Sequence, residues 1–166
     1  MKTQKQNPFL RRQFYFLLLF LILSYPLFSA VRTYLDYENG TVKDTVTGLV
    51  WQKCSYGQNN DAGCTGSAGT KIWKDALSYC EGLTLGGRSD WRLPALKELL
   101  TLVNPLKSNP AIDTALFPNT VSSYYWSSSP YVSNPTSAWI VNFNNGAVYY
   151  GNMTGTFQIR CVAGGN

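Results

Sequence analysis

The stretch GGRSDWRLPALKELLTLV, residues 86–103, decides the expected fold. Its second half carries apolar residues at the i, i+3, i+4, i+7 spacing of an amphipathic helix: Leu96, Leu99, Leu100 and Val103. Pro94 suits the first turn of such a helix, where its missing N–H costs no hydrogen bond. The stretch therefore predicts a loop that leads into a helix with one face against a core.

The segments before this stretch predict a hairpin, a strand and a second helix. A hairpin is predicted from TYLDY (33–37) and TVKD, which flank Asn39-Gly40, a pair that accepts the positive φ angles of a tight turn. A strand is predicted next, at GLVWQK (48–53). IWKDALSYCEGL contains apolar residues at helical spacing and a glycine suited to the end of a helix: Trp73, Ala76, Leu77, Cys80 and Gly82. We expect Cys80 to point into the core.

The segments after it predict a long loop and then strands. Residues 104–123 contain three prolines and predict an ordered loop. YYWSSS, SAWIVNF, AVYYG and TFQIRCV predict strands, with a tight turn at Asn145-Gly146. Two short helices among six or so short strands indicate an α+β fold.

Residues 1–30 predict an export signal or an N-terminal membrane anchor. Four basic residues precede the apolar run FYFLLLFLIL (14–23), and SYP follows it. Cleavage after Ala30 would place Phe28 where a small residue is preferred, so an uncleaved anchor stays open as an alternative. The exported domain would span residues 31–166, in the periplasm, at the cell surface or secreted.

The net charge of +5 belongs mostly to this segment. Four of the 14 Lys and Arg residues and none of the 9 Asp and Glu residues lie in residues 1–30, which leaves +1 for residues 31–166. A nucleic-acid partner is therefore not expected, and membrane contact is expected only through the N-terminal segment. A local basic patch for sulfated glycans remains an alternative, built from Arg88, Arg92, Lys97 and Lys107.

All four cysteines lie in residues 31–166, and an even number in an exported domain predicts disulfides. Of three possible pairings we favour Cys54 with Cys64, which closes a loop poor in apolar residues, and Cys80 with Cys161, which ties a helix to the last strand. A zinc site of four thiolates is the rival interpretation, weakened because the sequence has no CxxC pair.

The chain has no histidine, which excludes Ser-His and Cys-His nucleophile pairs and histidine metal sites. Ser127, Ser128 and Ser129 have no neighbouring base, so we interpret them as hydroxyls at a strand edge. Asp90-Trp91-Arg92 predicts a structural corner in which Trp91 is buried and Arg92, together with Asp90 or Glu98, ties the loop to neighbouring backbone carbonyls. The alternative is that Arg88 and Arg92 grip a sulfate or carboxylate. We expect no enzyme activity and no cofactor.

Four motifs of the chain resemble, in the same order, the signatures of a known family: NGTVKDTVTGLVWQK, GGRSDWRLPALKEL, YYWSSS, and WIVNFNNGAVYY followed by RCV. From Tyr34 to Val162 the chain resembles the Lcl C-terminal domain family, a bacterial exported domain named after a Legionella collagen-like adhesin. The family is similar to C-type-lectin-like folds, in which a cysteine of the first helix bridges to the final strand. The resemblance therefore implies the same pairing of Cys80 with Cys161.

The resemblance also implies a binding function, because the domain of the founding adhesin is associated with sulfated glycosaminoglycans. The expected partner is such a glycan or another surface polysaccharide, and the alternative is an assembly component of the envelope or a surface appendage that binds protein. An enzyme similar to formylglycine-generating oxidases would require a free cysteine, against the even count.

Aromatic residues for a sugar platform would come from Trp126, Trp139, Tyr149 and Tyr150, although aromatic residues in strands more often pack in the core. Asn142, Asn144 and Asn145, with Asp113 or Asp61, offer oxygen ligands of the kind that calcium prefers. We expect no metal site, because the Glu-Pro-Asn and Trp-Asn-Asp patterns of calcium-dependent lectins are absent. The candidate ligand-binding residues are Arg88, Arg92, Lys107, Trp126, Asn142, Asn144 and Tyr149.

Overall fold

The structure, a computed structural model, describes residues 33–165, and the predicted signal or anchor in residues 1–30 lies outside them. The described part is α+β, as predicted, with ten short strands in two five-stranded sheets and two short α-helices. The elements are β1 (Tyr34–Asp36), β2 (Thr41–Asp44), β3 (Val50–Gln52), β4 (Thr70–Lys71), α2 (Trp73–Glu81), β5 (Trp91–Arg92), α3 (Leu96–Leu99), the 3₁₀ helix η1 (Leu100–Leu102), β6 (Tyr124–Pro130), β7 (Ser137–Asn142), β8 (Ala147–Asn152), β9 (Phe157–Gln158) and β10 (Val162–Ala163).

The first sheet has the order β1-β2-β3-β10-β5, and each neighbouring pair is antiparallel. The last strand of the chain thus lies between β3 and β5, with Val162 opposite Trp51 on one side and Arg92 on the other. This places the motif RCV beside the DWR corner of the opening stretch.

The second sheet has the order β4-β9-β6-β7-β8. Strands β6, β7 and β8 form an antiparallel meander, and β9 runs parallel to β6. With six residues, β8 is the longest strand at an edge of either sheet, and its outer side has no neighbouring strand among the described residues.

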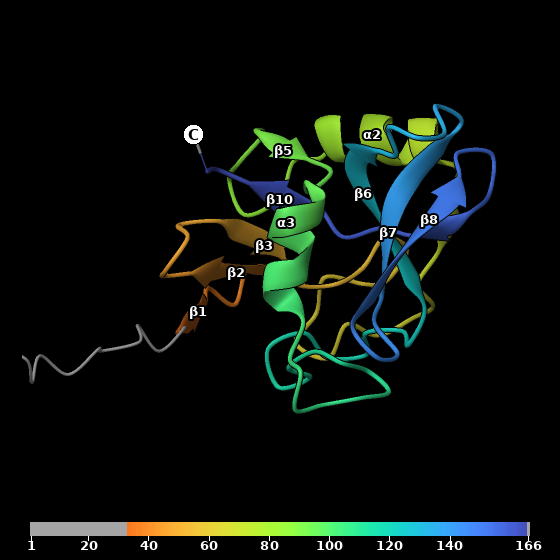
Figure 1. The fold of residues 1–166 in the computed structure, drawn as a ribbon. Helices are drawn as coiled ribbons and strands as arrows, with labels where there is room; N and C mark the ends of the chain where they lie inside the picture. Colours follow the sequence, from red (N-terminus) through yellow and green to blue (C-terminus); the bar gives the residue numbers. More distant parts are fainter. Residues whose placement is uncertain (1–32, 166) are drawn as a thin grey trace, which may run out of the picture. The chain divides into compact units, whose positions relative to one another are not determined.

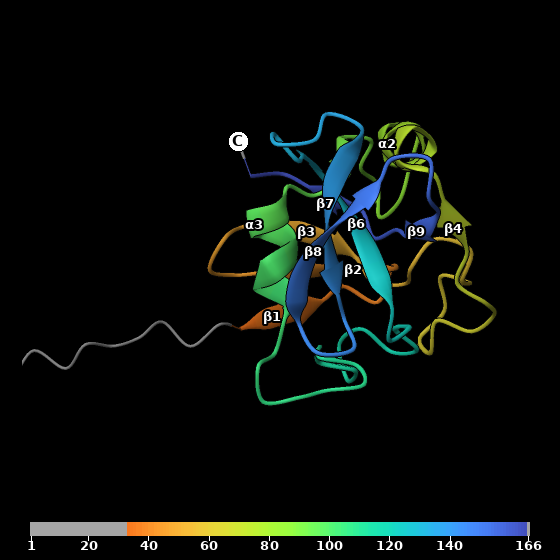
Figure 2. The same ribbon diagram turned by 45° about the vertical axis from the view of Figure 1, so that its right-hand side comes forward.

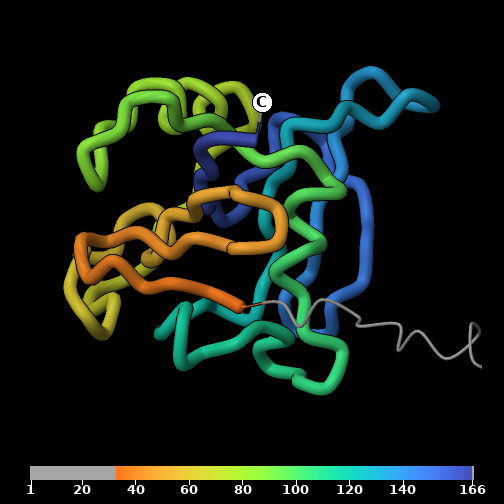
Figure 3. Tube along the Cα trace, turned by 90° about the vertical axis from the view of Figure 1, so that its left-hand side faces the viewer, coloured from red at the N-terminus to blue at the C-terminus, as the bar shows by residue number. Residues whose placement is uncertain are grey.

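Helix α3 and η1 stand between the two sheets, and α2 lies across one end, beside β5 and β6 (Figures 1 and 2). One core cluster joins both sheets around α3 and includes Trp51, Leu99, Tyr125 and Val141. A second cluster, which includes Ala76 and Cys80, lies under α2. Residues 104–123 form the predicted loop without helix or strand, at the end of α3 opposite α2 (Figure 3).

Both predicted disulfides are confirmed. Cys54 pairs with Cys64, and Cys80 of α2 pairs with Cys161 just before β10. All four sulfur atoms are thus bound, which excludes the zinc interpretation. Cys80 is fully buried, as its place in the helical pattern predicted.

The predicted start of the helix at Pro94 is wrong, because α3 begins two residues later, at Leu96. The backbone N–H of Ala95 donates to the Glu98 carboxylate, and that of Leu96 donates to the Ser129 hydroxyl. These two acceptors stabilise the first turn from Ala95 onward. The chain then tightens into η1 and buries Leu102, a residue that the predicted stripe left out.

The predicted single last strand TFQIRCV is also wrong. It divides into β9 in the second sheet and β10 in the first, and fully buried Arg160 lies between them.

The turn at Asn39-Gly40 is a four-residue connection, with positive φ at Glu38 and Gly40 rather than at Asn39. The turn at Asn145-Gly146 is confirmed, with Gly146 at φ 78°.

Candidate functional site

The three cations predicted to bind an anion each pair with a carboxylate. Arg88 donates to both oxygens of Asp90, at 2.9 and 2.5 Å, and Lys107 Nζ lies 3.0 Å from Asp113. The hydrogen bond from Arg88 holds the pKa of Asp90 below its usual value, and that from Lys107 does the same for Asp113. Arg88 and Lys107 also belong to segments at opposite ends of α3 (Figure 1). The structure therefore does not bring them together as one sulfate site.

Arg92 holds the predicted structural corner. Its guanidinium donates twice to the Glu98 carboxylate at 2.7 Å and once to the Gly164 carbonyl at 3.0 Å. Trp91 beside it is buried, and its indole N–H donates to the carbonyls of Leu85 and Arg88. Arg92 thus ties the opening stretch to the C-terminal strand, which is the interpretation that the sequence favoured.

The prediction that Trp126 contributes to an exposed platform is wrong. Trp126 lies on β6, in the middle of the second sheet, and its side chain is fully buried. Its indole N–H donates to the Lys71 carbonyl at 2.9 Å, and its ring packs against Phe157. Ser127 is also buried, with its hydroxyl donating to the Trp139 carbonyl, so the strand-edge interpretation does not hold for this serine.

The asparagines of the β7–β8 turn use their side chains to shape that turn. The Asn142 amide oxygen accepts from the Asn144 N–H, and the Asn145 amide oxygen accepts from the Ala147 N–H. The carboxylate of Asp61 is likewise occupied within its own loop, by Gly63 and Thr65. Within residues 33–165, no group of three or more His, Cys, Asp or Glu residues is arranged to hold a metal ion.

An exposed aromatic cluster lies on the β7–β8 half of the second sheet. Trp139 of β7 faces Tyr150 of β8 in register, and Tyr131 stacks on Tyr150 with ring centroids 4.4 Å apart and planes 17° apart. Tyr131 also meets Trp139 edge to face at 4.8 Å. We call Tyr131, Trp139 and Tyr150 the aromatic platform. Because Tyr150 is 55% exposed, the platform presents ring surface to solvent.

Tyr149 lies on the other face of β8, because successive side chains of a strand point to opposite faces. It is opposite Ile140, and its ring meets Tyr124 at 5.7 Å. The structure therefore separates Tyr149 from the platform, although the sequence grouped it with Trp139 and Tyr150. Tyr131 is the member that sequence reasoning missed.

A signal for this region is present in the sequence. Residues 114–159, which contain β6 to β9, include no Lys, Arg, Asp or Glu. In a chain with 14% charged residues, such a segment marks strands β6 to β9 as chemically different from the strands of the first sheet. Thr, Asn, Val, Pro and Tyr hold most of its exposed positions instead, so its surface is uncharged.

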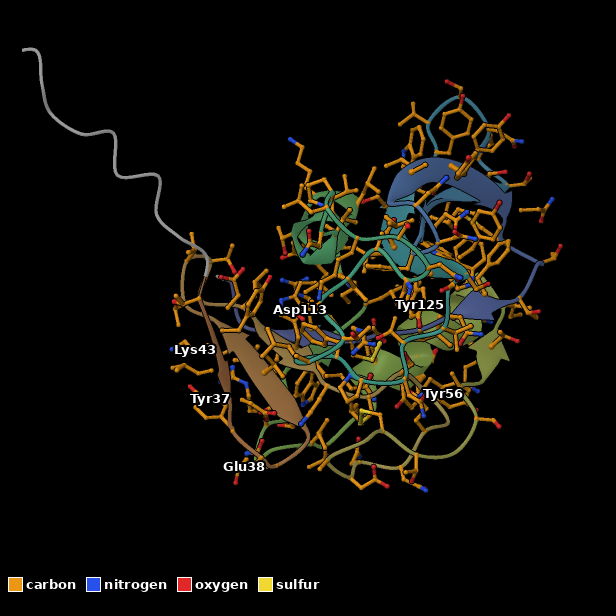
Figure 4. The ribbon with its side chains drawn as sticks, turned by 90° about the horizontal axis from the view of Figure 1, so that it is seen from below. Tyr37, Glu38, Lys43, Tyr56, Asp113 and Tyr125 are labelled. Atoms are coloured by element: carbon orange, nitrogen blue, oxygen red, sulfur yellow. A yellow bond between two sulfur atoms is a disulfide. The ribbon has the colours of Figure 1, made fainter. Side chains whose placement is uncertain are left out.

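Two cavities lie away from the platform, at the first sheet. One, of about 570 Å³, is lined by Asp36, Glu38 and Lys53, and Lys53 Nζ lies 2.6 Å from Asp36. The other, of about 500 Å³, lies between Tyr34 and the loop of residues 104–117. Figure 4 shows the β1–β2 hairpin, with Tyr37, Glu38 and Lys43, on the outer side of the domain, whereas Tyr125 points inward. Neither cavity is lined by a platform residue.

Comparison with curated proteins gave no match to this chain. Within residues 33–165, none of the helices has the length and apolar character needed to span a membrane. A family-level comparison matches residues 40–163 to the Lcl C-terminal domain, which is most of the chain. The two disulfides and a family of exported, adhesin-related domains together fit an extracellular location. The ordered motifs, the disulfide framework and this match lead to one conclusion: the chain belongs to the Lcl C-terminal domain family.

Proposed function

We propose that this domain is a non-enzymatic, adhesin-like binding module of the bacterial cell surface, and that its ligand is a glycan. The observation that carries the proposal is the aromatic platform. Its three rings touch one another and leave Tyr150 more than half exposed. Membership in an adhesin-related family supports the same conclusion.

The chemistry of the platform suits a sugar. A pyranose ring has an apolar C–H face that packs on an aromatic ring, and hydroxyls at its edge that bond to polar groups. Tyr131 and Trp139 both pack against Tyr150, so these side chains lose little conformational freedom when a ligand arrives. A platform held in place in this way supports binding without rearrangement.

The experiment measures binding of the full chain to an array of bacterial and host glycans, with Trp139→Ala and Tyr150→Ala as the test variants. Tyr149→Ala is the matched control, because it removes a neighbouring exposed tyrosine from the opposite face of the same strand. The proposal expects binding that both test variants weaken and that the control keeps. Binding to no glycan, or equal binding by all variants, would contradict it.

A second candidate function is that of an assembly component that binds protein, and the open edge of β8 favours it. This strand has no charged residue and no proline, the features with which proteins protect exposed edges. An extended segment of a partner protein could add a strand there. Cross-linking from a cysteine placed at Val148, followed by mass spectrometry on intact cells, would identify a protein partner, and capture of glycan alone would exclude this candidate.

A further inference from the structure

We infer that the ligand of the aromatic platform is an uncharged glycan. This inference rests on the proposed function and names the ligand class of the same site. It differs from the sulfated ligand that the basic residues and the family resemblance implied. The inference depends on the distribution of charge around the platform and on the polar groups that share its face.

The platform lies within the charge-free segment. Tyr131, Trp139 and Tyr150 all belong to residues 114–159, as do both strands adjacent to β7 in the sheet. A sulfate or carboxylate lying on these strands would meet no cation from them. It would lose part of its hydration without gaining an ionic partner, which weakens binding.

Both arginines of the opening stretch are already paired with carboxylates. Arg92 is held by Glu98 through two bonds, and Arg88 by Asp90. An anionic ligand would have to compete with a carboxylate of the same chain at each of these residues, and a bidentate pair such as Arg92 with Glu98 is the strong kind of ion pair. An uncharged sugar carries no such cost.

The polar groups beside the platform are neutral donors. Asn152 lies opposite Ser137 and follows Tyr150 by two residues on β8. Its side chain is therefore on the same face of the sheet as Tyr150, about 7 Å further along the strand. The N–H and hydroxyl of Thr154 both donate to the amide oxygen of Asn152, at 3.0 and 2.9 Å. These bonds orient the amide so that its NH₂ group is the free donor, which suits a sugar hydroxyl.

The strand geometry also matches a chain of sugars rather than a single ring. Val148, Tyr150 and Asn152 alternate along one face of β8, and all three are exposed. A linear glycan lying along the strand would meet an apolar side chain, an aromatic ring and an amide in turn. We therefore expect longer oligosaccharides to bind more tightly than a disaccharide.

The experiment compares the full chain on cellohexaose, chitohexaose and heparin over a salt gradient. We expect at least one of the two neutral oligosaccharides to bind, with an affinity that does not change between low and high salt. Trp139→Ala and Tyr150→Ala should each weaken that binding about tenfold or more. Tyr149→Ala should leave it unchanged, and so should Lys97→Ala, which removes an exposed cation from α3 next to the sheet.

The outcomes separate the two proposals. Salt-sensitive binding to heparin, lost in Lys97→Ala and absent for both neutral sugars, would overturn this inference and leave the proposed function in place. No binding to any of the three probes would overturn this inference as well, and the glycan array would then decide the proposed function. A change of oligomeric state in Tyr150→Ala, without any effect on sugar binding, would mean that the platform pairs with a second copy of the chain, and would overturn both.

Discussion

Arg160 and Phe117 meet in the core, with the guanidinium carbon 4.9 Å from the centre of the ring. The guanidinium also donates to the carbonyls of Gln52 and Lys53 and to the hydroxyls of Ser55 and Thr120. No carboxylate among residues 33–165 pairs with it, and burial lowers the pKa of Arg160 from its usual value. One buried cation thus joins β3, the loop of residues 104–123 and the segment between β9 and β10.

Replacing Arg160 should destabilise the domain strongly. Arg160→Ala leaves two carbonyls and two hydroxyls without their donor in the core, and we expect the free energy of unfolding to fall by about 3–5 kcal/mol. Urea denaturation followed by tryptophan fluorescence measures this change. The matched control is Arg88→Ala, which removes an exposed arginine and should leave the unfolding midpoint in place. Equal stability of the two variants would refute the structural role of Arg160.

The two disulfides should contribute unequally to stability. The bond between Cys80 and Cys161 spans 81 residues of sequence, and that between Cys54 and Cys64 spans 10. By loop-closure entropy the long bridge stabilises the folded state by about 4–5 kcal/mol and the short one by about 3. Thermal denaturation of the two double Cys→Ala variants tests the order, and a larger loss for the Cys54 and Cys64 pair would contradict it.

Glu98 should make the stability depend on pH. Burial by itself raises the pKa of Glu98, but the hydrogen bonds from Arg92 and from the Ala95 N–H outweigh it, so the pKa is lowered in the folded protein. A carboxyl with a lowered folded pKa stabilises the fold above its unfolded value of about 4.3 and loses that contribution as pH falls through the folded value.

The test compares the wild-type chain with Glu98→Gln. We expect the unfolding free energy of the wild type to fall more steeply between about pH 5 and pH 3, because only the wild type loses the contribution of Glu98. Asp36, Asp90 and Asp113 also have lowered pKa values, but they titrate in both proteins and cancel in the difference. Parallel pH profiles would show that the ion pair with Arg92 contributes nothing.

Gly146 should resist substitution more than Gly48, a glycine of similar φ. The φ of Gly146 is +78°, and an added Cβ would lie 2.5 Å from Cγ1 of Val103. Gly48 has a similar φ of +75° and nothing within 4 Å of an added Cβ, so Gly48→Ala measures the backbone cost alone, about 1–2 kcal/mol. We expect Gly146→Ala to lower the free energy of unfolding by more than that. If both variants lose the same amount, the contact with Val103 is not a constraint.

The local patterns were sufficient for most of the elements, because they depend on neighbours along the chain. Helix α2, the β1–β2 hairpin and strands β6, β7 and β8 formed where the apolar spacing and the turn residues predicted them. The disulfides also followed from the loops that they close. The start of α3 did not, because its first N–H groups are capped by Glu98 and by Ser129, a residue on β6.

The candidate site was less predictable from local patterns. Trp126 and Trp139 both lie in strands rich in aromatic residues, yet Trp126 is fully buried against Phe157, whereas Trp139 is half-buried and packs against Tyr131 and Tyr150. Tyr131 comes from a loop and joins the platform through the fold of the β6–β7 hairpin. Burial of a ring depends on which segments pack over it, and no spacing within one strand encodes that.

By itself, the sequence determined the α+β class, the corner around Trp91 and the family, since these depend on local patterns or on ordered motifs, and it favoured the cysteine pairing that the structure has. Only the tertiary structure decided that Arg88 and Lys107 are paired with carboxylates and that Trp139, Tyr150 and Tyr131 share one exposed face. The physical reason is that pairing, burial and exposure are set by long-range packing of strands from different parts of the chain, which local periodicity does not specify.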